Sequence, residues 1–151
     1  MYQSVSPNVN FVEQEKKIEA FWEEEHIFEK SIDSRKKGTP YVFYDGPPTA
    51  NGKPHIGHVL TRVIKDMIPR YRTMKGYMVP RKAGWDTHGL PVELGVEKEL
   101  GITKEDIGKT ISIEEYNDHC RKNVMKYTAE WEDLSRKMGY WVDMAHPYIT
   151  Y

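Results

Sequence analysis

Apolar residues recur at helical spacing near the N-terminus, inside a stretch that is otherwise polar. Asn10 and Glu13, just before this stripe, have the spacing of a helix-capping pair. The pattern predicts a helix over residues 11–25 that packs a narrow face on another part of the protein. The stripe consists of Ile18, Phe21 and Trp22.

A continuous β-branched and aromatic run at residues 41–44 is typical of a short strand buried on both faces. After a loop over residues 45–53, apolar positions return at helical spacing and predict a long helix that ends before Gly76. Pro69 is expected to kink or interrupt this helix. Its apolar positions are Val59, Leu60, Val63, Ile64, Met67, Ile68, Tyr71 and Met74.

A second short strand is expected at residues 77–81, so the segment predicts a β-α-β unit with two parallel strands. A loop over residues 84–90 then leads to a helix with Pro91 in its first turn and Gly101 at its end. A capped turn is expected at Thr103, and one long helix over residues 112–138. The extended run at residues 148–151 indicates that the chain continues in a longer protein.

These elements suggest three parts. Residues 1–38 are expected to form an N-terminal helical arm, and residues 39–139 the first half of a nucleotide-binding domain with additional helices. Residues 140–151 are expected to begin a connection to further domains that this sequence does not contain.

Composition narrows the class of protein only slightly. With 38% hydrophobic residues, no membrane-spanning run and no signal-peptide pattern, the chain reads as a soluble cytoplasmic protein. The single cysteine, Cys120, excludes an internal disulfide. The net charge of −1 is the sum of an acidic segment at residues 11–30 and a basic segment at residues 51–82. The basic segment could lie near a bound polyanion, or both segments could simply be solvated helix faces.

Candidate chemistry gathers in two loops. In a parallel sheet, the loops after both strands lie at one edge, where ligands bind, so residues 45–58 and 84–90 should be neighbours. The first loop runs into the start of the long helix, which is a natural phosphate site. His55 and His58 share one side of its first turn, and Gly57 lets a flat base approach the backbone.

The histidine spacing alone leaves other interpretations open. Two histidines three residues apart could ligate a metal, but zinc would need further ligands nearby, for which only Asp45 and Asp86 are candidates. The pair could also cap the helix or lie on the surface. The flanking residues are needed to decide among these.

The stretch 44–58, which reads YDGPPTANGKPHIGH, closely resembles the first signature of the class I aminoacyl-tRNA synthetases. The stretch 84–93, GWDTHGLPVE, is similar to the corresponding loop of the isoleucine-specific members. A weaker resemblance continues through the Cys120 segment and residues 140–143, so it covers nearly the whole chain.

The resemblance implies an α/β fold, the first half of a Rossmann-like (HUP-type) parallel-sheet nucleotide-binding domain with an N-terminal helical arm. It implies that ATP, with Mg²⁺, activates L-isoleucine, which is then transferred to the 3′ end of isoleucine tRNA. The tRNA would be held mainly by domains absent from this sequence. No metal site within these residues and no membrane contact are implied.

The resemblance also assigns roles to individual residues. His55 and His58 would be catalytic, stabilising charge on the triphosphate. Pro47 and Asp86 would bind the amino acid, with the Asp86 carboxylate paired to its ammonium group; the open alternative is that Asp86 only caps its turn. The residues implied in ATP binding are Pro48, Thr49, Asn51, His55, Gly57 and His58.

The second signature of the family, Lys-Met-Ser-Lys-Ser, is absent from the sequence, so only half of an activating site is expected. Two alternatives stay open. One is a nucleotidyltransferase of the type that adenylylates phosphopantetheine and also uses a His-x-Gly-His loop. The other is a nucleotide-binding fragment without catalytic activity.

Overall fold

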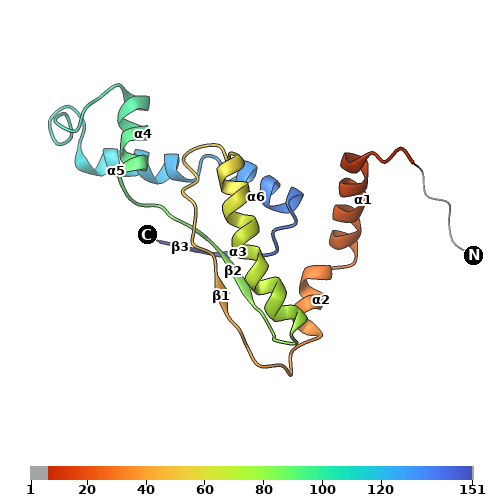
Figure 1. Cartoon of the computed structure of the whole chain (residues 1–151). Coiled ribbons are helices and arrows are strands. Elements are labelled where there is room, and N and C mark those ends of the chain that lie inside the picture. The colour runs from red at the N-terminus through yellow and green to blue at the C-terminus, as the bar shows by residue number, and fades with distance from the viewer. Residues whose placement is uncertain (1–6, 151) are drawn as a thin grey trace, which may run out of the picture.

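A small parallel β-sheet forms the centre of the protein (Figure 1). The computed structural model describes residues 7–150, and the first six residues of the predicted arm lie outside them. The strands are β1 (Phe43–Tyr44), β2 (Arg81–Trp85) and β3 (Asp143–Ile149), in the order β1-β2-β3, with both pairs parallel. The predicted α/β class is therefore confirmed.

Six helices surround the sheet within the described residues. They are α1 (Phe11–Glu24), α2 (Ile27–Asp33), α3 (Ile56–Met74), α4 (Leu90–Leu100), α5 (Ile113–Val124) and α6 (Thr128–Lys137). Figure 1 shows α3 crossing beside the sheet, α4 and α5 together at one end, and α1 with α2 at the other side. None of these helices is long and apolar enough to cross a membrane.

The β-α-β unit exists, but its strands lie later in the chain than predicted. β2 begins at Arg81, directly after Pro80, which has no N–H to donate to a strand ladder, and its position follows its pairing with β1 and β3. The prediction that β1 is buried on both faces is wrong, since the side chains of Val42 and Tyr44 are 60% and 58% exposed. The prediction of a two-stranded sheet is also wrong, because residues 143–149 pair with β2 as a third strand.

Helix α3 turns a polar face inward. Its buried residues are Arg62, Asp66 and Pro69, and the helix continues through Pro69, so the predicted interruption is wrong. The apolar stripe that predicted the helix lies on the outside. Its exposed members are Leu60, Val63, Ile64, Met67, Ile68, Tyr71 and Met74.

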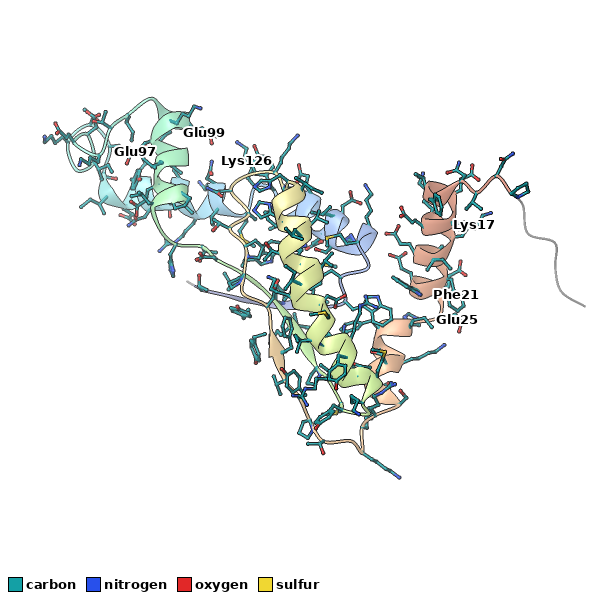
Figure 2. The ribbon with its side chains drawn as sticks, viewed as in Figure 1. Lys17, Phe21, Glu25, Glu97, Glu99 and Lys126 are labelled. Carbon is teal, nitrogen blue, oxygen red and sulfur yellow. The ribbon has the colours of Figure 1, made fainter. Side chains whose placement is uncertain are left out.

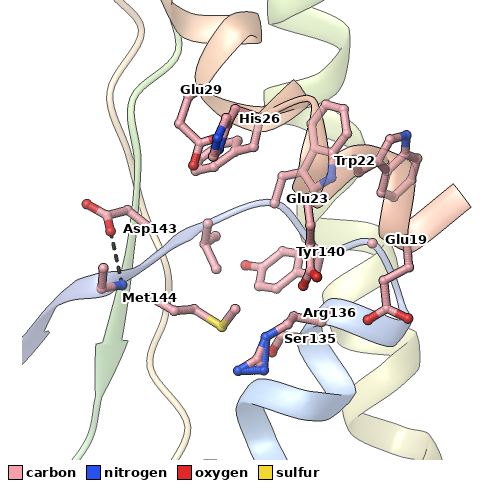
Figure 3. Close-up of a pocket in the computed structure, with 15 residues that line it drawn as sticks. Glu19, Trp22, Glu23, His26, Glu29, Ser135, Arg136, Tyr140, Asp143 and Met144 are labelled. Atoms are coloured by element: carbon pink, nitrogen blue, oxygen red, sulfur yellow. Dashed lines mark hydrogen bonds between the residues drawn. The ribbon is translucent and has the colours of Figure 1, made fainter. Parts of the chain in front are cut away.

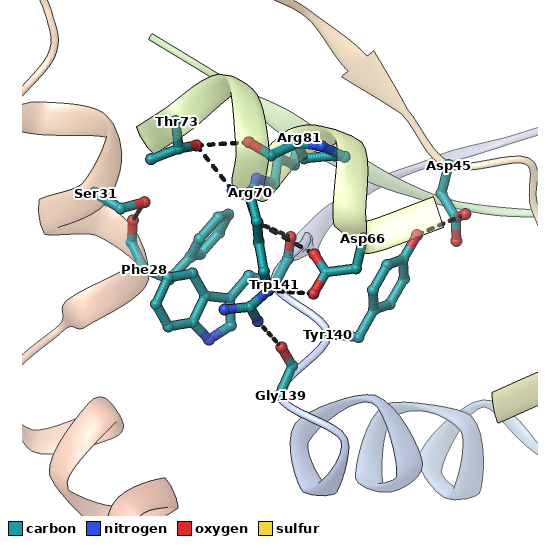
Figure 4. Close-up of polar contacts among 11 residues, drawn as sticks. Phe28, Ser31, Asp45, Asp66, Arg70, Thr73, Arg81, Gly139, Tyr140 and Trp141 are labelled. Atoms are coloured by element: carbon teal, nitrogen blue, oxygen red, sulfur yellow. Dashed lines mark hydrogen bonds and ion pairs between the residues drawn. The ribbon is translucent and has the colours of Figure 1, made fainter. Parts of the chain in front are cut away.

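The buried carboxylate of Asp66 holds the inner face of α3 by ion pairs (Figure 4). Arg70, one turn later, pairs with it and also donates to the Gly139 carbonyl, while Arg81 of β2 approaches it at 3.4 Å. Burial lowers the pKa of Arg81, partly offset by Asp66. Because one unpaired charge here would be costly, the network ties α3 to β2 and to the start of β3.

The predicted helix over residues 112–138 is two helices, α5 and α6, separated by a turn at residues 125–127. Its start is as predicted, since the Ser112 side chain accepts the Glu115 N–H at 3.1 Å. The break occurs because the Tyr127 N–H donates to the Ala50 carbonyl, at 3.0 Å, and not to its own helix. Lys126, in the turn, pairs with Glu99 of α4 at 3.4 Å (Figure 2).

The N-terminal arm contacts the body mainly through aromatic rings. α1 begins as predicted, with the Asn10 side chain accepting the Glu13 N–H at 3.3 Å. Trp22 then packs edge to face on Trp141, with ring centroids 5.1 Å apart. Phe21, labelled in Figure 2, stays 50% exposed, so only part of the predicted stripe is covered within the described chain.

Candidate functional site

Two loops meet at the carboxyl ends of β1 and β2. We call residues 45–55 the first rim loop and residues 86–89 the second rim loop. The Asp86 N–H donates to the Pro48 carbonyl at 2.9 Å, and the Asn51 amide donates to the Pro91 carbonyl, also at 2.9 Å. The prediction that the two loops are neighbours is therefore confirmed.

His55 and His58 form a reciprocal cap at the start of α3. The Nδ1 atom of His55 accepts the Gly57 N–H at 3.1 Å, and the Nδ1 atom of His58 accepts the backbone N–H of His55, also at 3.1 Å. Since both Nδ1 atoms are acceptors, each neutral ring carries its proton on Nε2. The pair thus offers two N–H donors at the positive end of a helix.

The surroundings of His58 keep its ring neutral. The two imidazole centroids lie 3.8 Å apart with the planes tilted by 33°. Burial lowers the pKa of His58, and the charges of His55 and Arg62 lower it further. Near pH 7 the His58 ring is therefore a neutral hydrogen-bond donor. The capping interpretation and the phosphate interpretation of the sequence describe one arrangement, because the cap uses Nδ1 and leaves Nε2.

Helix α6 supports the first rim loop from below. The indole N–H of Trp131 donates to the Gly52 carbonyl at 2.8 Å, and the Tyr127 N–H donates to that of Ala50. Ala50, Trp85 and Trp131 form one buried apolar cluster. Trp85 and Trp131 are therefore core residues, and no pattern in the sequence indicated that Trp131 bonds to the loop.

Asp45, the first residue of the first rim loop, is buried, and one oxygen of its carboxylate makes two polar contacts. Its Oδ1 atom pairs with Lys65 of α3 and accepts the Tyr140 hydroxyl at 2.9 Å, while the Tyr148 hydroxyl donates to its backbone carbonyl. Burial and the Asp45 charge raise the pKa of Tyr140 above its ordinary range. Sequence reasoning considered Asp45 only as a possible metal ligand, because no local pattern links it to residues so distant in the chain.

Asp86 divides its carboxylate between two tasks. Oδ1 accepts the His88 N–H at 3.3 Å and lies 3.5 Å from the Thr150 hydroxyl. Within residues 7–150 no hydrogen bond reaches Oδ2. The residue therefore caps its turn, as the alternative interpretation proposed, and one carboxylate oxygen stays available to a ligand. Pro47, Pro48 and Thr49 are half-buried beside it.

The described residues contain no group of three or more His, Cys, Asp or Glu side chains that could hold a metal ion. A cavity of about 420 Å³ lies elsewhere, between the arm and the start of β3 (Figure 3). It includes Trp22, Tyr140 and Trp141 but no residue of either rim loop. The chemistry of the rim is thus that of donors and one free carboxylate oxygen, without a preformed metal cage.

Comparison with known proteins gives a family match and a similar fold. The family model described as "tRNA synthetases class I (I, L, M and V)" matches residues 17–151. Among solved structures, the agnB2 LeuRS of Agrobacterium radiobacter, determined as a ternary complex with tRNA and LeuAMS, superposes with a TM-score of 0.61. That match covers 90% of this chain and 15% of the other at 21% identity, so it supports the fold alone.

Curated relatives are more similar in sequence. The chain is 69% identical to the protein named Isoleucine-tRNA ligase of Bacteroides fragilis over 86% of its length, and 69% identical to that of Porphyromonas gingivalis over 87%. It is 54% identical to the Clostridium novyi protein of that name over its whole length. It spans only 11%, 12% and 14% of these three relatives.

Proposed function

Because the chain belongs to the class I tRNA synthetases, we propose that its rim holds the first half of a site that activates isoleucine with ATP. The observation that carries the proposal is the fixed pair of Nε2–H donors on His55 and His58, at the end of a loop whose Pro48 carbonyl accepts the Asp86 N–H. In the longer parent protein, the activated residue would then be transferred to isoleucine tRNA.

In this proposal the reaction is a displacement at phosphorus. A carboxylate oxygen of isoleucine attacks the α-phosphorus of ATP, the bond to the β-phosphate oxygen breaks, and pyrophosphate leaves with the bond electrons. The negative charge that moves onto the leaving group faces the two Nε2–H donors and the N-terminus of α3. Donors held in place before the reaction stabilise that charge without reorganising.

The remaining rim residues would shape the two substrate positions. Gly57 presents backbone without a side chain where the adenine would lie. Asn51 holds the first rim loop to the start of α4 through the Pro91 carbonyl, beside Pro48 and Thr49. The free Oδ2 of Asp86 would pair with the isoleucine ammonium group, and Pro47 would contact its aliphatic side chain.

Mg²⁺ would reach the rim together with ATP, bound to its phosphate oxygens and neutralising their charge. Asp45, the carboxylate within the first signature, has its Oδ1 atom bound by Lys65 and by the Tyr140 hydroxyl. The parts of the chain that lie before and after the rim keep the roles proposed from sequence. Residues 1–38 would act as an arm, and residues 140–151 would lead from the sheet toward the rest of the parent.

Pyrophosphate exchange in the full-length parent tests the proposal. We expect exchange that depends on isoleucine, and His55→Asn or His58→Asn should reduce kcat by about 10²-fold, as loss of one transition-state donor does. Exchange that depends on valine or leucine but not isoleucine would refute the specificity. Exchange with a phosphorylated cofactor alone would favour the nucleotidyltransferase alternative.

The 151-residue chain itself can be tested separately by calorimetry with ATP and with a non-hydrolysable isoleucyl-adenylate analogue. Binding without measurable exchange would show that the rim retains affinity without the remainder of the site. Exchange at enzyme-like rates would instead show that this half is sufficient.

A further inference from the structure

We propose that Trp131, which no sequence pattern marks, is a positioning residue for the ATP triphosphate. It would act by aiming the backbone N–H groups of the first rim loop and by holding the His58 ring. The inference rests on the proposed function, since it concerns the same rim. Trp131 lies on α6 and is 2% exposed, so it cannot contact ATP directly.

The first step concerns the direction of the loop peptides. α6 binds two carbonyls of the loop, that of Ala50 through the Tyr127 N–H at 3.0 Å and that of Gly52 through the Trp131 indole at 2.8 Å. In a planar trans peptide, the N–H of the following residue points opposite to the carbonyl. The N–H groups of Asn51 and Lys53 are therefore directed away from α6.

Those two N–H groups are available to a ligand. Within the described chain neither the Asn51 N–H nor the Lys53 N–H has a hydrogen-bond partner. Backbone N–H groups that converge in a loop bind anions well, particularly beside a helix N-terminus. Together with Nε2–H of His55 and His58, they would give the triphosphate four donors on one loop and helix start.

The second step concerns the His58 ring. It packs on the Trp131 indole with centroids 4.6 Å apart and planes at 55°. The Arg62 guanidinium also contacts that indole, at 5.0 Å from the ring centroid, and it lies 5.2 Å from the centroid of the Tyr140 ring. Arg62 also donates to the Ser135 hydroxyl, which donates in turn to the Trp131 carbonyl at 2.7 Å. The indole is thus fixed from several sides.

Arg62 has a second effect, because its charge contributes to lowering the pKa of His58. The unit formed by Arg62, Trp131 and Ser135 therefore sets both the orientation of the His58 ring and its neutral state. A single buried side chain, Trp131, connects this unit to the loop carbonyl at Gly52. Trp131→Phe removes the indole N–H together with one of the two fused rings, and it keeps an aromatic ring beside His58, so it should disorient the loop.

The test is Trp131→Phe in the full-length parent, measured by pyrophosphate exchange. Loss of one buried hydrogen bond should raise KM for ATP about 3- to 10-fold, with KM for isoleucine unchanged and kcat within about twofold. The matched control is Trp141→Phe, the same change at a tryptophan that packs on the arm, which should alter neither KM. Trp131→Tyr supplies the same measurement if the phenylalanine variant does not fold.

Three outcomes separate the possibilities. If KM for ATP rises selectively, the positioning role is supported. If the Trp131 variants change both KM values equally, or neither, the positioning role is overturned, although the histidine variants can still reduce exchange and support the proposed function. If the wild-type parent shows no isoleucine-dependent exchange, the proposed function itself is refuted, whatever the Trp131 variants show.

Discussion

The His58 ring illustrates how one side chain serves both the fold and the candidate chemistry. Its Nδ1 closes the first turn of α3 by accepting the His55 N–H at 3.1 Å. Its face packs on Trp131, which removes it partly from water. Because the fold uses Nδ1 and the ring face, Nε2 is left with a proton to donate.

We predict that His58 titrates below the ordinary histidine value of about 6.5 in the 151-residue chain. Between the folded and unfolded pKa values, the unfolded state binds more protons, so the free energy of unfolding should rise with pH across that window. NMR titration of the ring and urea unfolding between about pH 5 and 7 measure both effects. A His58 pKa at or above 6.5 would contradict the burial argument.

Tyr140→Phe tests the buried network at Asp45. The change removes the hydroxyl that donates to the Asp45 carboxylate at 2.9 Å and leaves a buried acceptor with less support. We expect the free energy of unfolding to fall by about 1–3 kcal/mol, measured by urea unfolding.

The control for this change is Tyr116→Phe. Tyr116 is also buried, but its hydroxyl donates at 3.4 Å to the Glu93 carbonyl, which is neutral. Its loss should therefore cost about 1 kcal/mol or less. Equal losses of unfolding free energy for the two variants would show that the hydrogen bond from Tyr140 to Asp45 stabilises the fold no more than the one from Tyr116 to Glu93.

These residues show where prediction from sequence succeeds and where it fails. The His55 and His58 pair was predictable, because both residues lie in one helical turn whose spacing is visible in the chain. Trp131 and Tyr140 were not, because they reach the first rim loop from 79 and 95 residues away in sequence. Local spacing carries no information about such contacts.

Strand positions were predicted less well than helices. The segment after α3 was assigned its strand too early, because Tyr77 to Val79 look more strand-like than Lys82 to Gly84. Pairing with β1 and β3, and not residue preference, places β2 at Arg81–Trp85. β3 contains Pro147 and alternates poorly, so its presence in the sheet could not be read from its sequence.

Gly84→Ala tests the contact between β2 and β3. A Cβ at Gly84 would overlap the ring of Tyr148, its partner in the strand register, so the ring or one of the two strands must shift. We expect a loss of about 1–3 kcal/mol in the free energy of unfolding, as overpacking of a core produces.

The matched control is Gly95→Ala in α4, where the new Cβ would meet only the Asn123 side chain at 3.8 Å. Alanine favours a helix over glycine by about 1 kcal/mol, so this variant should be as stable as wild type or more so. In a Tyr148→Ala background, Gly84→Ala should cost much less free energy of unfolding than it does in the wild type, because the ring is gone. An equal cost in both backgrounds would show that the ring is not the cause.

The molecule as a whole presents a large apolar surface on α3. Leu60 and Met67 are 63% and 60% exposed, whereas Arg62 and Asp66 of the same helix are 5% and 9% exposed. Contiguous apolar patches of this kind usually mark a surface that another element covers. The chain spans 11–14% of the relatives described above, so most of their length is available for such an element.

We predict that Leu60→Gln with Met67→Gln leaves the folding stability of the 151-residue chain nearly unchanged, within about 0.5 kcal/mol. Glutamine and leucine have similar helix propensity, and neither side chain is buried. Val96→Ala, at a position that is 2% exposed, should by contrast cost about 2 kcal/mol. Urea unfolding of the wild-type chain and of both variants measures these changes. Sedimentation should show less self-association for the double variant than for the wild-type chain. Equal or greater self-association would contradict the idea that the apolar surface of α3 makes contacts between molecules.

The inward polar face of α3 has a further consequence for how the chain reaches its structure. A rotation of α3 about its own axis would bring the apolar stripe onto the sheet, an alternative packing that hydrophobic burial alone favours. The ion pair of Asp66 with Arg81 and the hydrogen bond from Arg70 to the Gly139 carbonyl oppose that rotation, because it would separate them. Two packings of α3 therefore compete during folding, one with its apolar face and one with its polar face on the sheet. The charged side chains of Asp66, Arg70 and Arg81 favour the second.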